Sequence, residues 1–232
     1  MPTSETHAHW ETFYREKPVW AIGWLEHPDD WLRQLITDGT IRKGTALDLG
    51  CGAGDKSVYL AKNGFSVTGV DISLTALREA KALAQRAGAT VEFRMADAAN
   101  LVILKKPFTF VLDFSTFHII SEDVRTDYLN EIFRLTKPPS TRHSGESATP
   151  ESDPGRSGIA SQLFLHVFSK RDPNHTLGFF RSDTTKEITY AFDKTDIDRL
   201  FGSHFKIVQS QPSDFTINNK KLYFDEYLME RL

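Results

Sequence analysis

The chain has 232 residues, of which 40% are hydrophobic and 25% are charged, as in an ordinary globular protein and unlike a disordered or fibrous one. Its formal net charge of −3 gives no long-range field that attracts polyanions, so we expect no binding to nucleic acid or to a membrane surface. No run of about 18 apolar residues is present that would span a bilayer, and the first residues are polar, unlike the core of a signal peptide. We therefore expect a soluble, cytoplasmic protein whose substrate is a small molecule or a protein.

The chain has a single cysteine, Cys51. It has no second cysteine with which to form an internal disulfide, and no cysteine or histidine stands near it at metal-ligand spacing. We therefore expect no disulfide and no metal site, and we interpret Cys51 as a small packing residue.

Residues 1–40 form an aromatic N-terminal arm. All four tryptophans of the chain lie in it, and the arm is interrupted by Pro18, Gly23 and Pro28, which predicts a turn-rich region. Its aromatic side chains have two roles that the sequence leaves open. They form either a hydrophobic cover packed on the rest of the protein or a lid over a bound ligand.

From residue 45 onward, apolar runs alternate with stretches whose apolar residues recur at helical spacing. We expect strands at 46–49, 66–70, 91–95, 108–114, 163–168, 206–209 and 222–227, and helices around 58–61 and at 74–87, 124–135 and 195–201. Segment 223–228 fits a strand or a helix, because its aromatic residues match both periods. The alternation predicts right-handed crossovers and a doubly wound, Rossmann-like α/β sheet that is mainly parallel.

Residues 137–161 differ in composition from the rest of the chain. They are rich in Pro, Ser, Thr, Gly and Arg and lack apolar periodicity, so they cannot bury enough surface to fold. We predict a flexible insertion within a single domain that covers residues 1–232.

A glycine-rich turn follows the first strand and opens a helix. In this turn, glycines at 50, 52 and 54 allow backbone N–H groups to approach a ligand, and the helix N-terminus adds partial positive charge. Asp71 follows Gly50 by 21 positions and ends the second strand, which is the spacing at which an acid meets ribose hydroxyls. The third glycine comes one residue too early for a dinucleotide loop, and Asp48 before the loop favours a cation over a pyrophosphate. The pattern indicates a cofactor that contains a nucleoside.

The stretch 48–54 resembles the signature of class I S-adenosylmethionine-dependent methyltransferases, with Asp71 matching the ribose-binding acid of that family. Residues 96–98 resemble its adenine-contacting motif, and residues 111–115 resemble the motif that borders the methyl-donor pocket. The resemblance implies a seven-stranded sheet with an antiparallel C-terminal strand.

The aromatic arm is similar to that of the thiopurine- and tellurite-type small-molecule methyltransferases, as are segments 117–119 and 167–173. Two departures stand against this finer resemblance. Ala21 follows Trp20 where an Asp is usual, and Lys137-Pro138-Pro139 replaces the usual Lys-Pro-Gly-Gly turn.

The resemblance assigns roles to three groups of residues. The predicted cofactor-binding residues are Asp48, Gly50, Cys51, Gly52, Gly54, Asp71, Ile72, Asp97, Ala98, Asp113, Phe114 and Trp20, and the predicted substrate or lid residues are Trp10, Tyr14 and Trp24. His118 and Asp113 are the predicted catalytic residues. Each has a plainer alternative, because an acid after a strand, such as Asp97, often caps a helix, and a histidine such as His118 is often structural.

The expected reaction is transfer of a methyl group from S-adenosylmethionine to a small-molecule nucleophile, with a thiol as the acceptor that the arm suggests. A protein lysine methyltransferase is one alternative, although residues 113–116 do not contain the Asn/Asp-Pro-Pro-Tyr/Phe motif of amine-specific members. A non-catalytic subunit that binds S-adenosylmethionine and regulates a partner is the other. The sequence does not identify the acceptor or the oligomeric state.

Overall fold

The computed structural model describes residues 4–17, 29–139, 159–173, 178–182, 185–217 and 220–232. Trp20 and Trp24, and most of the predicted insertion, lie outside the described residues. Their predicted roles therefore stay predictions.

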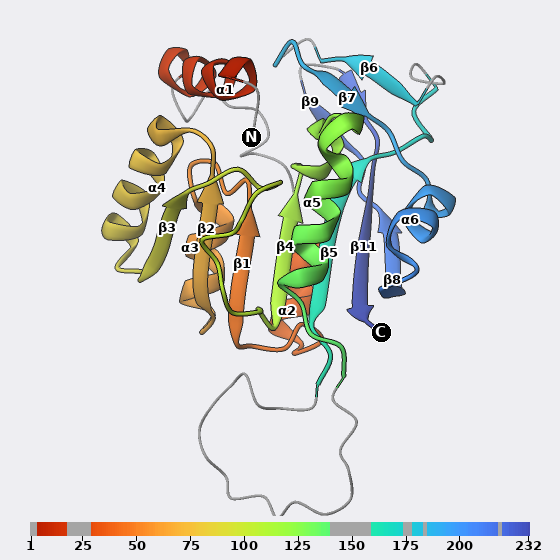
Figure 1. Cartoon of the computed structure of the whole chain (residues 1–232), viewed down its shortest axis with the longest axis horizontal. Helices are drawn as coiled ribbons and strands as arrows, with labels where there is room; N and C mark the ends of the chain where they lie inside the picture. The colour runs from red at the N-terminus through yellow and green to blue at the C-terminus, as the bar shows by residue number, and fades with distance from the viewer. Residues whose placement is uncertain (1–3, 18–28, 140–158, 174–177, 183–184, 218–219) are drawn as a thin grey trace, which may run out of the picture.

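A seven-stranded sheet forms the centre of the molecule (Figure 1), with the strand order β3-β2-β1-β4-β5-β11-β8. Its strands are β1 (Thr45–Leu49), β2 (Ser66–Asp71), β3 (Val91–Met95), β4 (Phe110–Phe114), β5 (Gln162–Phe168), β8 (Phe205–Pro212) and β11 (Phe224–Arg231). The first five run parallel to one another, and β11 is antiparallel to both β5 and β8. The predicted doubly wound fold is confirmed.

Two strands differ from their predicted form. The segment 223–228 fitted either period, and from Phe224 onward it belongs to the strand β11, which pairs on both sides, with β5 and with β8. The strand expected at 108–114 begins only at Phe110, since Phe108 instead makes an isolated bridge with Thr136.

Helices cover both faces of the sheet (Figure 1). The covering helices are α2 (Asp30–Thr37), α3 (Asp55–Lys62), α4 (Leu74–Ala87), α5 (Glu122–Arg134) and α6 (Lys194–Phe201), whereas α1 (Ser4–Glu16) lies over the carboxyl edge of the sheet. Among the described residues, no helix is long and apolar enough to cross a bilayer.

The described part of the N-terminal arm is helical, and the predicted turn-rich region is wrong there. Trp10, Phe13 and Tyr14 fall at helical spacing on one side of α1, where they pack with Ala76 of α4. This packing stabilises a helix that the Pro and Gly residues of the arm obscured in the sequence. A second helix, α2, follows at Asp30 and buries Leu32, Leu35 and Ile36.

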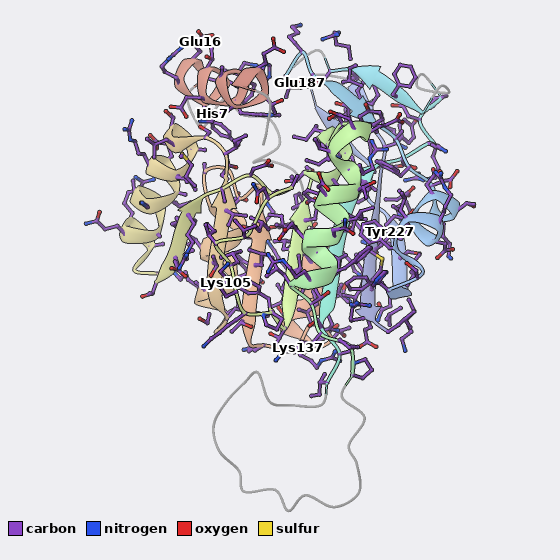
Figure 2. The ribbon with its side chains drawn as sticks, viewed as in Figure 1. His7, Glu16, Lys105, Lys137, Glu187 and Tyr227 are labelled. Carbon is purple, nitrogen blue, oxygen red and sulfur yellow. The ribbon has the colours of Figure 1, made fainter. Side chains whose placement is uncertain are left out.

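Two short hairpins were not predicted: β6 (Phe179–Arg181) with β7 (Ile188–Tyr190), and β9 (Phe215–Ile217) with β10 (Lys220–Leu222). The β6–β7 hairpin lies at the same edge of the sheet as α1, where the labels of His7 and Glu187 stand at the top of Figure 2, and Glu187 Oε1 lies 3.5 Å from His9 Nε2 of α1. Lys137, where the predicted insertion begins, lies at the opposite edge (Figure 2). The insertion therefore starts far from the carboxyl ends of the parallel strands.

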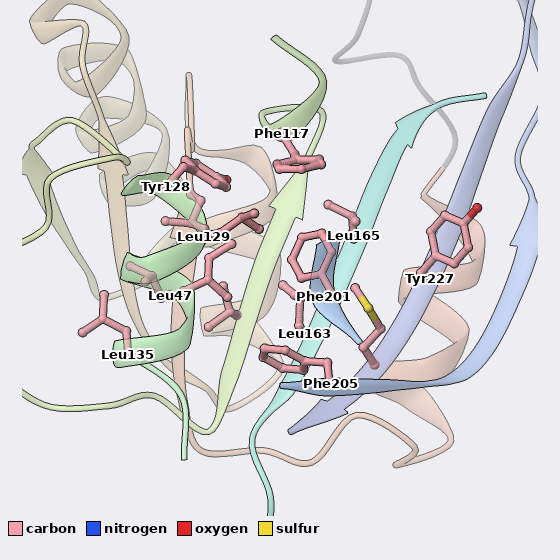
Figure 3. Close-up of a cluster of buried hydrophobic side chains, with 14 of the residues drawn as sticks. Leu47, Phe117, Tyr128, Leu129, Leu135, Leu163, Leu165, Phe201, Phe205 and Tyr227 are labelled. Atoms are coloured by element: carbon pink, nitrogen blue, oxygen red, sulfur yellow. The ribbon is translucent and has the colours of Figure 1, made fainter. Parts of the chain in front are cut away.

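Alternation along the strands divides the core between the two faces of the sheet. Leu47, Val111, Leu163 and Leu165 pack against α5 and α6, where Tyr128 and Phe201 are fully buried (Figure 3). The neighbouring residues on the same strands, such as Ala46, Phe110 and Phe164, point to the opposite face and pack against α2 and α3. Both faces are covered, as a parallel sheet requires.

Candidate functional site

The glycine-rich turn connects β1 to α3 at the carboxyl edge of the sheet. Gly50, Gly52 and Gly54 all have positive φ, at +62°, +52° and +85°. A Cβ on Gly52 would lie 2.6 Å from the Tyr14 hydroxyl oxygen, so the turn passes directly under α1. Only glycine gives this backbone both its conformation and its clearance.

Asp71, at the end of β2, holds the turn in place. Its Oδ2 accepts a hydrogen bond from the Gly52 amide at 2.8 Å, and its Oδ1 accepts one from the Ser73 amide at 2.8 Å. Burial raises the pKa of Asp71, although these amide hydrogen bonds favour the ionised form. The acid at the predicted ribose position therefore also shapes the loop and the turn at Ile72 that leads into α4.

Asp48 lies on β1 beneath the turn, with an exposed fraction of only 2%. Its Oδ2 accepts a hydrogen bond from the Ser57 hydroxyl at 2.6 Å. Burial raises the pKa of Asp48 to about 7. A carboxyl group in this state is stabilised in its charged form by a nearby cation.

Lys56 is a residue of this site that sequence reasoning missed. Its Nζ lies 2.6 Å from Asp55 Oδ2, 3.4 Å from Asp29 Oδ2 and 4.6 Å from the centre of the Phe114 ring. Burial opposes its charge, but Asp55 and Asp29 outweigh that effect and raise its pKa. No sequence signal separates a buried lysine from the many lysines that lie on surfaces.

These residues line one small cleft at the carboxyl edge of the sheet. Its lining residues are Tyr14, Asp48, Gly50, Cys51, Gly52, Ala53, Asp55, Lys56 and Phe114. The structure thus brings together the predicted loop residues, Asp48, Tyr14 and Phe114. Burial raises the pKa of the Cys51 thiol, which supports its interpretation as a packing residue.

Asp113 does not lie in this cleft, contrary to its predicted catalytic and cofactor-binding roles. Its exposed fraction is 0%, and burial raises its pKa to about 6. Its carboxylate accepts hydrogen bonds from the Tyr128 hydroxyl at 2.6 Å and from the amides of Thr116 and Phe117, each at 3.0 Å. Asp113 therefore fixes the turn after β4 from inside the core and cannot touch a ligand in this structure.

Asp97, His118 and Trp10 are not among the residues that line this cleft. Asp97 Oδ1 accepts a hydrogen bond from the Ala99 amide at 3.0 Å, so Asp97 closes a local turn around Ala98. The His118 ring is buried and packs edge-on against Phe168, with 4.7 Å between the ring centres. Trp10 packs against Phe13 at 5.5 Å, in the contact between α1 and α4, while Tyr14 reaches the cleft.

Comparison with known proteins finds methyltransferases among the proteins that this chain resembles. Residues 46–139 match the family model described as "Methyltransferase domain". The 2-heptyl-1-hydroxyquinolin-4(1H)-one methyltransferase of Mycobacteroides abscessus is 33% identical over 123 residues, which are 53% of this chain and 52% of that protein. A ubiquinone biosynthesis O-methyltransferase of Bordetella avium is 32% identical over 92 residues, 40% of this chain and 36% of that protein. The matches span about half or less of these relatives.

Solved structures extend the likeness to nearly the whole chain. The 1,6-didemethyltoxoflavin-N1-methyltransferase of Burkholderia thailandensis, solved with S-adenosylhomocysteine, has a TM-score of 0.71 at 19% identity and covers 97% of this chain and 87% of its own. The magnesium protoporphyrin IX methyltransferase of Synechocystis has a TM-score of 0.65 at 19% identity, with coverages of 99% and 95%. The chain therefore shares the fold of these two solved methyltransferases.

Proposed function

We propose that the protein transfers a methyl group from S-adenosylmethionine to a small-molecule acceptor. The observation that carries this proposal is the cleft itself, which Asp48 and the glycine turn line at the end of β1, while Asp71, at the end of β2, holds that turn through the Gly52 amide. Ligands of doubly wound sheets bind at this edge. When bound, S-adenosylmethionine supplies an electrophilic methyl group on a positively charged sulfonium, so the protein has mainly to align a nucleophile and exclude water.

The residues present fit this cofactor. Asp48 is a buried carboxyl group whose raised pKa a cationic ligand would lower again, and it lines the cleft together with the backbone of the glycine turn. Asp71 would accept hydrogen bonds from the ribose hydroxyls with its remaining lone pairs, and Asp97 and Ala98 would contact the adenine. Tyr14, on α1, covers the turn and would exclude water.

A small aromatic acceptor has the best support. The relative from Mycobacteroides abscessus is named for a hydroxyquinolone, and the neighbour from Burkholderia thailandensis holds 1,6-didemethyltoxoflavin. The resemblance of the N-terminal arm to thiopurine- and tellurite-type enzymes makes a thiol the second acceptor to test. A protein acceptor has no such support.

Two measurements test the proposal. Calorimetry with S-adenosylhomocysteine should show binding to the wild-type protein that is strongly weakened in Asp71→Ala. A screen with methyl-labelled S-adenosylmethionine against hydroxyquinolines, phenols, thiols, amines and lysine peptides should show transfer to a small molecule. Binding without any transfer would favour a regulatory subunit, transfer only to peptides would favour a lysine methyltransferase, and absence of binding would overturn the proposal.

A further inference from the structure

Ser115 follows the last residue of β4 and has an unusual backbone conformation. Its φ is +74°, in the left-handed region that residues other than glycine rarely adopt. Its amide donates a hydrogen bond to the His166 carbonyl at 3.1 Å, which ties it to β5. Ser115 is partly exposed and follows Phe114, which lines the cleft. Strain held by the surrounding structure at a ligand-binding edge is typical of functional positions.

His166, on β5, is the side-chain partner of Ser115. The Ser115 Oγ lies 2.8 Å from His166 Nδ1, although 51 positions separate the two residues in sequence. The imidazole ring is stacked between Phe114, at 4.3 Å and 3°, and Phe224, at 4.5 Å and 20°. With an exposed fraction of 0%, His166 is reached from the cleft edge only through its neighbours. The two flanking rings fix Nδ1 against the Ser115 hydroxyl.

Glu226, on β11, stands beside this pair. It is the antiparallel register partner of His166, and directly paired residues point to the same face of a sheet. Gln211 donates a hydrogen bond to Glu226 Oε2 at 3.0 Å, whereas Oε1 is buried with no hydrogen-bond partner among the described residues. The nearby cation Lys56, whose Nζ lies 4.6 Å from the centre of the Phe114 ring, is paired with Asp55 and Asp29. A buried carboxyl group that is the register partner of an imidazole is suited, in its ionised form, to balance positive charge on the ring.

We propose that Ser115 and His166 form the proton-accepting pair for the methyl acceptor, with Ser115 in contact with the acceptor and His166 acting through it. This inference rests on the proposed function. The acceptor's nucleophilic atom forms a bond to the methyl carbon as the carbon–sulfur bond breaks and its electron pair stays on sulfur. The acceptor's proton moves to Ser115 Oγ while the Ser115 hydroxyl proton moves to His166 Nδ1. His166 becomes an imidazolium beside Glu226 and returns the proton through Ser115 after the product leaves.

The step requires one particular hydrogen-bond direction. His166 Nδ1 must be unprotonated at rest, with the Ser115 hydroxyl as donor, so that the Ser115 oxygen can accept from the acceptor. His118, the histidine that the sequence favoured, lies at the same edge but packs edge-on against Phe168. The two histidines therefore make competing predictions that substitution can separate.

The chain offers a matched control for this pair. Ser203 Oγ lies 2.7 Å from His204 Nδ1, and the His204 ring is stacked on Phe133 at 3.9 Å and 5°. This second serine–histidine pair is exposed and follows α6, at the start of β8. His204→Asn thus makes the same chemical change as His166→Asn in a similar local arrangement away from the cleft.

The first measurement needs no acceptor. Nitrogen NMR of the histidine rings in the complex with S-adenosylhomocysteine should show His166 Nδ1 without a proton, and Ser115→Gly should shift that signal while leaving His204 unchanged. The His166 signal is assigned from its loss in His166→Asn. A protonated Nδ1 would overturn the inference, because Ser115 would then have no site to which it could pass a proton.

The second measurement is methyl transfer to a series of ring-substituted phenols or hydroxyquinolines of graded acidity. Ser115→Ala, Ser115→Gly and His166→Asn should each lower kcat by about 100-fold on the least acidic acceptor, and the defect should shrink as the acceptor becomes more acidic. Ser115→Gly relieves the strained φ and should raise Tm above that of Ser115→Ala, yet lose the same activity. The affinity for S-adenosylhomocysteine should stay within about twofold of wild type, and His204→Asn should retain its kcat.

The outcomes separate this inference from the function beneath it. The proton-accepting role would be overturned if the Ser115 and His166 variants retained kcat or lost it equally for all acceptors. It would also be overturned if these variants were active and His118→Asn alone was inactive. Wild-type protein that binds S-adenosylhomocysteine but methylates no acceptor would overturn the proposed function together with this inference.

Discussion

The carboxylate of Glu11 in α1 holds Thr75 at the start of α4 by two hydrogen bonds, from the Thr75 amide at 3.0 Å and from its hydroxyl at 2.5 Å. The Ser73 hydroxyl donates a third, at 2.8 Å. Burial opposes the charge of Glu11, but these hydrogen bonds prevail and lower its pKa to about 2. An anion at a helix N-terminus is favourable in itself. Since Asp71 binds the Ser73 amide, α1 is attached to the turn that also shapes the cleft.

The first prediction is that Glu11→Gln loosens α1. The charged hydrogen bonds should be worth about 1 kcal/mol after allowance for their partial exposure. Because the folded pKa is lowered, this contribution is complete above about pH 4.5 and is lost as the pH falls toward 2. Hydrogen exchange of α1 at neutral pH should therefore be faster in Glu11→Gln, and Glu16→Gln, at the exposed end of the helix, serves as the control.

The same experiment with and without S-adenosylhomocysteine decides between a lid and a fixed cover. A lid is drawn from weakly held structure, so binding should slow exchange in α1. Exchange that does not change on binding would leave packing as the role of Trp10 and Tyr14.

The second prediction concerns Gly52 and Tyr14. Gly52→Ala should destabilise the protein, because the residue has φ +52° and its new Cβ would lie 2.6 Å from the Tyr14 hydroxyl oxygen. Tyr14→Phe removes that oxygen and leaves the ring carbon Cζ at 3.6 Å, an ordinary contact. Gly52→Ala should therefore cost about 1 kcal/mol less in the Tyr14→Phe background. Denaturant unfolding of the four proteins measures this coupling, and strictly additive losses would show that Tyr14 does not lie over the turn.

The alternation of strands and helices made the sheet and its carboxyl edge predictable. The strand at 91–95 was predicted at its observed bounds, and the glycine turn and Asp71 meet as their spacing indicates. These features depend on local periodicity and on motifs within one βαβ unit, which a sequence carries directly.

Features that depend on tertiary contacts were missed. The Ser115–His166 hydrogen bond joins two strands that are far apart in sequence, and the helix α1 depends on its packing against Ala76 of α4. Asp113 illustrates the opposite error, since its place in a motif at a strand end suggested a ligand contact. Its burial against Tyr128 became visible only in three dimensions.

The third prediction is that Asp71→Asn weakens the binding of S-adenosylhomocysteine by about 1.5 to 3 kcal/mol, because a charged hydrogen-bond acceptor is lost. Asn keeps one oxygen to accept from a backbone amide, which spares more of the glycine turn than Ala would. The control ligand is an analogue of S-adenosylhomocysteine that lacks both ribose hydroxyls and so cannot donate hydrogen bonds from them to Asp71. Its affinity should be nearly the same for wild type and variant, and an equal loss for both ligands would show that Asp71 acts on the loop alone.

The fourth prediction follows from the buried carboxyl group of Glu226, which has an exposed fraction of 1%. Burial raises its pKa from 4.5 to about 7. Because the folded pKa is the higher one, the stability that the neutral form contributes is complete below about pH 4.5 and is lost as the pH rises through 7. Glu226→Gln should therefore be more stable than wild type at pH 8.5, by up to about 3 kcal/mol, and by much less at pH 5. Urea unfolding across this range measures the difference, and Glu230→Gln is a control near the end of the same strand.

The last prediction concerns the segment between α5 and β5. The Lys137 amide donates a hydrogen bond to Ser161 Oγ at 2.8 Å, and the Ser161 amide donates one to the Lys137 carbonyl at 2.9 Å, so the two chain ends meet before residue 140 and after residue 158. Replacing residues 140–158 by a short glycine-containing turn should therefore leave this junction intact. Shortening the loop should raise the stability by at most about 1 kcal/mol, since closure entropy varies slowly with loop length.

Ser161→Ala is the matched control for that deletion. Ser161 is buried, and its hydroxyl also donates to the Phe108 carbonyl at 2.7 Å, so its loss leaves buried groups unpaired and should cost about 1 to 3 kcal/mol. Thermal unfolding of Ser161→Ala and of the deletion variant compares the contribution of the junction to stability with that of residues 140–158. A large loss of stability on deletion would show that residues 140–158 pack as an ordered element. A loss of methyl transfer at unchanged stability would instead make them part of the substrate site, although Lys137, which precedes them, lies at the opposite edge of the sheet from the cleft.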